Sequence, residues 1–224
     1  MEALPVNDVT QGRTWADGER DWVHAYFYPI PATDRGVWVV EQHGAIIGQC
    51  YCVDYPWDRC VREAPRGLIL EFGVRAGASL QRIAAAARRA RRKVYGFDWW
   101  KGLPHSADGF TKTDCTAERP VDLPPNVTLI DGLFSDTLEG FLEAHRGAIG
   151  FINLDCDLFS SSYFVLCCCV DRFVKGSLIA LSDIAFAPEA QRRAWCRFQK
   201  ETGQDWEMVG KNHLWGEVWR KRDG

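Results

Sequence analysis

Two acidic residues each end an apolar run of the chain, and two glycines follow the first of them. Glu71 comes after the run LIL and Asp98 after VYGF, while Gly73 and Gly77 follow Glu71. Glycine lacks a Cβ atom, so the chain can turn sharply there and let a ligand approach the backbone. A helix that begins just after this turn would direct its free N–H groups at the same ligand. An acid at the position of Asp98 can accept hydrogen bonds from ribose hydroxyls, so these residues predict a nucleoside cofactor site.

The glycine spacing distinguishes between nucleoside cofactors. A dinucleotide site uses the pattern G-x-G-x-x-G, whereas the turn GVRAG has no middle glycine, and Val74 and Arg75 would crowd a pyrophosphate. Glu71 would repel a pyrophosphate but attract an ammonium or sulfonium group. The pattern EFGxxxGxS, which ends at Ser79, therefore favours S-adenosylmethionine over NAD. An NAD-dependent oxidoreductase is the disfavoured alternative.

An alternation of strands and helices must position these residues. We expect strands near 68–73, 93–98, 127–131, 149–155, 177–183, 205–210 and 213–219, and helices near 79–92, 136–145, 160–173 and 188–202. Only a short turn separates the last two strands. They must be antiparallel, because a parallel connection needs a dozen or more residues. The expected fold class is therefore α/β, with a seven-stranded, mostly parallel sheet and one antiparallel strand near the C-terminus.

Residues 99–126 do not fit this alternation, because four prolines and several polar residues leave no room for a full helix. We expect a loop or a short helix there. A long loop at the ligand end of a sheet often has a function. Its candidate substrate contacts are His105, Asp108, Phe110 and Lys112.

The first 60 residues carry no cofactor motif. We predict that residues 1–60 are an N-terminal extension and that 61–224 form the cofactor-binding domain. Two strands are expected within 37–53, around a turn at His43 and Gly44. The extension is rich in aromatic residues, which leaves three interpretations open: a substrate lid, a contact in a homo-oligomer, or part of the core.

Composition excludes several classes of protein. The 224 residues are 46% hydrophobic and 25% charged, which is typical of a globular chain. The net charge of −3 argues against a dedicated nucleic-acid binder, and no apolar run approaches the roughly 20 residues of a membrane span. The nine cysteines show no zinc-site spacing, so we expect free thiols in a cytoplasmic protein. The basic run at 88–93 is interpreted as a solvated helix end, where cations interact favourably with the negative end of the helix dipole.

Four further segments strengthen the cofactor hypothesis. In order, they are KVYGFDWWKGLP from residue 93, NVTLIDGLFSDTLEGFL from 126, FINLDCDLFSSSYFVL from 151 and GSLIALSDIAF from 176. Together with the glycine motif they resemble the macrocin O-methyltransferase family, which are class I S-adenosylmethionine-dependent enzymes of antibiotic biosynthesis. The resemblance covers about residues 66–200 and implies a Rossmann-like methyltransferase fold. It also implies a methyl transfer to a small molecule.

The resemblance implies a role for each site residue. One group would bind the methionine part of the cofactor: Glu71, Gly73, Gly77 and Ser79. A second group would bind the ribose and flank the adenine: Asp98, Trp99, Gly132, Leu133 and Phe134. Asp155 would stand beside the transferred methyl group, as a magnesium ligand and a general base.

The metal site departs from the family pattern. Relatives use an acid after the fourth strand and a pair of acids after the fifth. Asp155 matches the first acid, but Ser182 stands where the pair should begin, which leaves Asp155 and Asp183 as candidate ligands. Magnesium can complete its octahedral shell with waters, and a metal-free mechanism is the alternative. In either case Asp155 or His105 is a candidate base for the proton of an alcohol.

The expected function is thus an S-adenosylmethionine-dependent methyltransferase that acts on a hydroxyl of a sugar or natural product. Three alternatives remain open. They are transfer to nitrogen, a non-catalytic protein that binds the cofactor, and, less favoured, an RNA methyltransferase.

Overall fold

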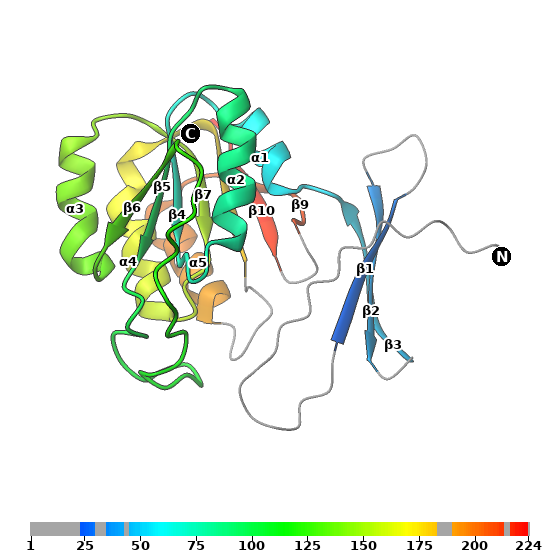
Figure 1. The fold of residues 1–224 in the computed structure, drawn as a ribbon. Coiled ribbons are helices and arrows are strands. Elements are labelled where there is room, and N and C mark those ends of the chain that lie inside the picture. Colours follow the sequence, from blue (N-terminus) through cyan, green and yellow to red (C-terminus); the bar gives the residue numbers. More distant parts are fainter. Residues whose placement is uncertain (1–22, 30–34, 43–44, 183–189, 213–215, 224) are drawn as a thin grey trace.

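A seven-stranded sheet forms the centre of the computed structural model, which describes residues 23–29, 35–42, 45–182, 190–212 and 216–223 (Figure 1). The strands lie in the order β6-β5-β4-β7-β8-β10-β9. Their bounds are β4 Leu68–Phe72, β5 Val94–Asp98, β6 Val127–Asp131, β7 Ile149–Leu154, β8 Phe173–Leu181, β9 Trp206–Gly210 and β10 Glu217–Lys221. Strands β4 to β8 pair in parallel, whereas β10 is antiparallel to both β8 and β9. The predicted fold class and its single reversed strand are confirmed.

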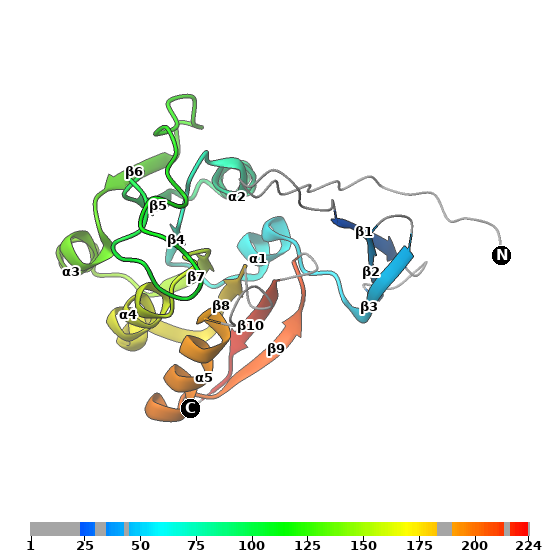
Figure 2. The same ribbon diagram turned by 90° about the horizontal axis from the view of Figure 1, so that it is seen from below.

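Helices cover both faces of this sheet. Their bounds are α1 Trp57–Glu63, α2 Ala78–Arg89, α3 Phe134–Ala144, α4 Phe159–Cys169 and α5 Ala190–Thr202. Figure 2 shows α1 and α2 on one side of the sheet and α3, α4 and α5 on the other. Each side has its own apolar cluster, so alternate residues of one strand enter different cores. All six residues of β7 are buried, which explains why the central strands read as continuous apolar runs.

Several predicted boundaries were wrong. The helix expected to reach residue 173 ends at Cys169, and a 3₁₀ turn, Val170–Arg172, leads directly into β8. Strand β8 therefore begins four residues before the expected 177. Gly176 has a φ of 84° inside the strand. The backbone is irregular there, so the sequence pattern does not indicate the first part of β8. The last strand, expected at 213–219, is β10 at 217–221.

A second sheet lies N-terminal to the α/β unit. It has three antiparallel strands in the order β1-β2-β3, with bounds Val23–Pro29, Arg35–Gln42 and Ala45–Val53. The two strands expected around residues 43 and 44 are therefore confirmed as β2 and β3, and β1 is an addition. Both figures show this sheet beside the α/β unit.

None of the helices in the described residues is long and apolar enough to span a membrane. The seven cysteines at and beyond position 60 are all free thiols, as the composition predicted.

Candidate active site

Polar residues form a row across the carboxyl ends of β4, β7 and β8. The strand register places Glu71 opposite Asn153 and Asn153 opposite Ala180. Ser182 lies two residues beyond Ala180 and so continues on the same face, because side chains alternate along a strand. This is the face that α1 and α2 cover.

These side chains form one buried hydrogen-bond network. Asn153 Nδ2 donates to Glu71 Oε1 at 2.7 Å, while Trp57 Nε1 and Ser182 Oγ donate to Asn153 Oδ1 at 2.9 and 3.1 Å. Glu71 and Asn153 are fully buried and Ser182 is 1% exposed, so bulk water does not compete for these bonds. Helix α1, through Trp57, thereby orients the amide that fixes one oxygen of Glu71.

The second oxygen of Glu71 is in a different state. Glu71 Oε2 is buried and has no hydrogen-bond partner in the described part of the chain. Burial raises the pKa of Glu71 to about 7, and nearby Asp98 acts in the same direction. Ser79 and Asn153 oppose this shift, although Ser79 does not satisfy Oε2. A buried carboxyl with one free oxygen can be stabilised in its charged form by a cationic donor.

Asp98 closes the glycine turn. Its Oδ2 accepts hydrogen bonds from the backbone N–H groups of Val74 at 2.8 Å and Arg75 at 2.7 Å, and its Oδ1 accepts one from Trp100 at 2.9 Å. The Trp100 indole in turn donates to the Arg75 carbonyl at 2.9 Å. A carboxylate has about four acceptor positions, so three backbone donors leave capacity for one ribose hydroxyl.

Gly73 allows two strand ends to meet. Its φ is 88°, and a Cβ atom built on it would lie 1.9 Å from the carbonyl oxygen of Asp155. The Asp155 N–H also donates to the Phe72 carbonyl at 2.8 Å. The close approach that the sequence predicted at Gly73 is therefore made by the chain itself, and it places Asp155 beside the glycine turn. Gly77, with a φ of 82°, caps the start of α2.

The residues predicted to flank an adenine are partly brought together. The Gly132 N–H donates to the Asp98 carbonyl at 3.0 Å, so the turn before α3 lies next to the end of β5. The Phe134 ring packs edge-on against Phe72, with centroids 5.3 Å apart. Leu133 is half-buried at the N-cap of α3. Trp99 is 37% exposed, and the Lys101 amine lies 4.4 Å from its ring centroid.

Segment 99–126 is a loop, as predicted, and its contacts fasten it to α4 and α5. Asp108 Oδ2 accepts a hydrogen bond from the Phe159 N–H at 2.9 Å, which caps α4, and its Oδ1 lies 3.3 Å from Arg193. The Cys115 thiol donates to Asp157 at 3.2 Å. Asp108 is therefore an anchor of the loop in this structure.

The other loop candidates differ in exposure. Phe110 is buried, and the exposed Lys112 is held through its backbone N–H by Ser106. His105 is exposed, and its Nε2 lies 3.2 Å from the Ser160 hydroxyl in the first turn of α4. His105 is thus held near the carboxyl edge of the sheet with its ring accessible.

The described residues contain only part of the predicted magnesium site. Among them, no three His, Cys, Asp or Glu side chains come together as metal ligands. Ser182, which replaces an expected acid, is directed into the buried network and bonded to Asn153. Asp183 lies outside the described residues, so Asp155 is the one predicted ligand that they include.

Sequence reasoning missed the two residues that organise the network, Trp57 and Asn153. A signal for Asn153 was present, because it is the only polar side chain in β7, IGFINL. A buried amide in an apolar strand must find partners, so it marks a polar contact. No comparable signal existed for Trp57, whose role follows from the packing of α1.

Comparison with known proteins identifies the family. Residues 70–184, which are 115 of the 224 residues, match the family model described as a methyltransferase domain. The chain belongs to this methyltransferase family. The matched range runs from β4 past the end of β8 and includes the glycine turn, Asp98, Asn153 and Asp155. No curated protein matches the chain.

Solved structures of methyltransferases share the fold. The calicheamicin methyltransferase CalS11 has a TM-score of 0.60 and 21% identity, over 73% of this chain and 75% of its own. The O-methyltransferase NovP has a TM-score of 0.59 and 18% identity, over 75% of this chain and 78% of its own. These values confirm the Rossmann-like methyltransferase fold. The resemblance to the macrocin enzymes in particular stays a prediction.

Proposed function

We propose that this methyltransferase transfers a methyl group from S-adenosylmethionine to a hydroxyl of a small molecule, such as a sugar or another natural product. The observation that carries the proposal is the carboxyl edge of the sheet, where Glu71, Asp98 and Asp155 surround one glycine turn. Two proteins of similar fold support the reaction class, because CalS11 is a calicheamicin methyltransferase and NovP is an O-methyltransferase.

The residues at this edge fit the cofactor. Glu71 offers a buried oxygen without a partner to the ammonium of the methionine part, and Asp98 retains acceptor capacity for the ribose. Gly77, Ser79, Trp99 and the turn at 132–134 would complete the binding site. When bound, S-adenosylmethionine supplies an electrophilic methyl group on a sulfonium.

The chain's own groups would then position and deprotonate the acceptor. Asp155 stands beside the glycine turn, and it is the proposed general base that accepts the hydroxyl proton. His105, held at the start of α4, is the second candidate for this proton. Holding the acceptor in line with the methyl group can provide much of the rate enhancement, because orientation alone is worth several kcal/mol. Of the two predicted magnesium ligands the described residues include only Asp155, so the proposed steps use these side chains alone.

Calorimetric titration with S-adenosylmethionine and S-adenosylhomocysteine tests the cofactor. We expect micromolar binding of both, with the same affinity when magnesium is present or chelated. No binding of either compound would overturn the proposal. A magnesium-dependent affinity would instead show that Asp155 and Asp183 act together as ligands.

Substitution of Asp155 tests the reaction. With a hydroxylated acceptor found by screening, Asp155→Ala should lower turnover by about 10²- to 10⁴-fold and leave cofactor affinity within a few-fold. Asp157→Ala is the matched control, because its carboxylate is held by the Cys115 thiol. Equal losses in both variants would contradict the role of Asp155, and an amine as the only productive acceptor would make this an N-methyltransferase.

A second candidate is a protein that binds the cofactor without catalysis. The buried and hydrogen-bonded Glu71 network favours a retained binding site, and a product assay separates the two functions. A cytoplasmic location and a homo-oligomer held by residues 1–60 stay predictions, which fractionation and sedimentation would test.

A further inference from the structure

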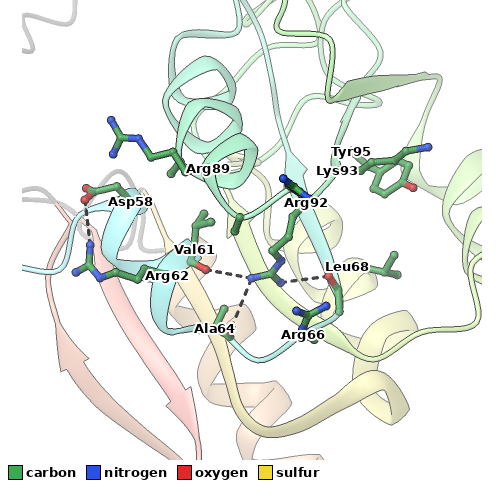
Figure 3. A pocket seen from close by; sticks show the side chains of 14 residues that line it. Asp58, Val61, Arg62, Ala64, Arg66, Leu68, Arg89, Arg92, Lys93 and Tyr95 are labelled. Carbon is green, nitrogen blue, oxygen red and sulfur yellow. Dashed lines mark hydrogen bonds and ion pairs between the residues drawn. The ribbon is translucent and has the colours of Figure 1, made fainter.

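A basic hollow lies at the opposite edge of the sheet from the candidate active site. It forms where β4 and β5 begin, where α2 ends and where α1 leads into β4, and its volume is about 610 Å³ (Figure 3). Pockets of this size hold small molecules. Its lining includes six cationic side chains and one acidic side chain: Arg62, Arg66, Arg89, Arg91, Arg92, Lys93 and Asp58.

Two of these cations are already engaged. Arg62 lies 3.6 Å from Asp58, one helical turn away on α1. The Arg92 guanidinium donates to four carbonyl oxygens of α1 and its connection to β4, at distances of 2.9–3.5 Å. Figure 3 shows Arg92 reaching from the start of β5 to this connection. Arg92 therefore fixes the wall of the hollow.

The other four cations have no acidic partner within the described ranges, and we call them the free cations: Arg66, Arg89, Arg91 and Lys93. They repel one another, because like charges line one hollow and the described residues supply no counterion to them. Burial lowers the pKa of Arg92, and the charge of Arg66 lowers it further. The dipole of α2 provides only about half of one negative charge, which does not balance this set.

Arg91 adds an independent observation. The Arg92 N–H bonds to the Ala87 carbonyl at 2.9 Å and the Arg91 N–H to the Arg88 carbonyl at 3.0 Å, which is the Schellman ending of a helix. Glycine is the usual residue at the left-handed position of this motif, but Arg91 occupies it with a φ of 55°. The chain thus keeps a cation where the backbone favours glycine, and such strain clusters at functional positions.

We propose that this hollow binds a compact small molecule that carries two or more phosphate groups. Arginine forms paired hydrogen bonds with phosphate oxygens. The four free cations around one hollow would be balanced more fully by a ligand with several anionic groups than by a ligand with a single anionic group. The concave shape and the net charge of −3 favour a small ligand over the extended backbone of a nucleic acid.

Calorimetric titration of the full chain with inorganic pyrophosphate and with ADP tests the proposal. Sulfate, which has a single anionic group, serves for comparison. We expect both diphosphates to bind at least tenfold more tightly than sulfate at the same ionic strength. Equal affinity for the two assigns recognition to the phosphates alone, whereas tighter binding of ADP assigns the site to a nucleotide. No binding of either overturns the proposal.

Variants separate the hollow from general charge effects. Arg66→Ser and Arg91→Gly should each weaken pyrophosphate binding at least fivefold. Arg88→Ser is the matched control, because Arg88 is exposed at the same helix end but does not line the hollow, and it should change affinity less than twofold. Arg91→Gly suits its backbone conformation, so its melting temperature should equal or exceed that of the parent.

Two results would contradict the inference. One is an equal loss of affinity in Arg88→Ser and Arg91→Gly, which would indicate diffuse electrostatic attraction. The other is tight binding of a single-stranded RNA oligonucleotide without binding of pyrophosphate, which would assign the surface to nucleic acid. Neither result depends on S-adenosylmethionine, so failure here and failure of the proposed methyl transfer are distinguishable.

Discussion

The two edges of the central sheet have opposite charge and differ in how that charge is held. At the carboxyl edge, Asp98 accepts three backbone hydrogen bonds and Glu71 is fixed by Asn153, so the fold itself orients these acids. At the amino edge, the free cations have no acidic partner among the described residues. The comparison indicates that one edge is preorganised by the chain's own donors. The other is an arrangement of cations whose charge a bound anion would balance.

The largest expected effect comes from breaking the carboxyl edge at Gly73. Gly73→Ala should destabilise the fold by about 3 kcal/mol or more, because the new Cβ would meet the Asp155 carbonyl at 1.9 Å and the backbone has a φ of 88°. Urea denaturation measures the change. Gly140→Ala is the matched control in α3, where no described atom beyond the local helix backbone lies within 4 Å of the new Cβ, and it should stabilise by about 0.5–1 kcal/mol. Parent-like stability of Gly73→Ala would contradict the close approach.

The next effect concerns the charge of Glu71. Its pKa is about 7 in the fold against 4.5 for the free side chain, so the folded state binds the proton more tightly and the parent loses stability as pH rises from about 4.5 to 7. Glu71→Gln lacks this loss, and its stability relative to the parent should rise by roughly 3 kcal/mol between pH 4.5 and 8. Denaturation at both pH values measures it. A constant difference would contradict the shift.

Cofactor binding sharpens the same prediction. An ammonium group near Glu71 favours the carboxylate, so affinity for S-adenosylhomocysteine should increase as pH rises through about 7 in the parent. The increase should be absent in Glu71→Gln. Glu143→Gln, at an exposed position of α3, controls for the loss of one carboxylate. An unchanged pH profile in Glu71→Gln would place the cationic group of the ligand elsewhere.

How far the sequence predicted these two edges depends on the kind of signal. Strand ends with acids and glycines obey a general rule about ligand position, so Glu71, Gly73 and Asp98 could be predicted as site residues from the chain alone. Asn153 and Trp57 were not found, because their partners lie 82 and 96 residues away and only tertiary packing joins them. The basic run at 88–93 was interpreted as a solvated helix end. The hollow that this run lines is formed where Arg92 contacts α1 and the α1–β4 connection, and no local sequence pattern reveals such a contact.

A smaller effect is expected at the helix that supports the carboxyl edge. Trp57→Phe removes the 2.9 Å hydrogen bond to Asn153 Oδ1, so that Ser182 Oγ is the remaining donor to this oxygen among the described residues. The expected loss is about 1–2 kcal/mol of stability, together with weaker cofactor binding, because Asn153 would orient Glu71 less firmly. Trp195→Phe is a control, since its buried indole nitrogen has no partner in the described chain. Equal effects on cofactor affinity would show that Trp57 acts through packing alone.

The smallest expected effect tests whether the two edges act separately. Arg66→Ser, at the amino edge, should leave affinity for S-adenosylhomocysteine unchanged within about twofold at 0.15 M salt. The five residues of β4 span about 16 Å, which is twice the Debye length of about 8 Å, so the exposed charge of Arg66 is screened from the glycine turn. A larger change would mean that the edges communicate through β4 or α2. Pyrophosphate would then alter cofactor affinity by the same factor by which the cofactor alters pyrophosphate affinity, because coupling between two binding sites is reciprocal.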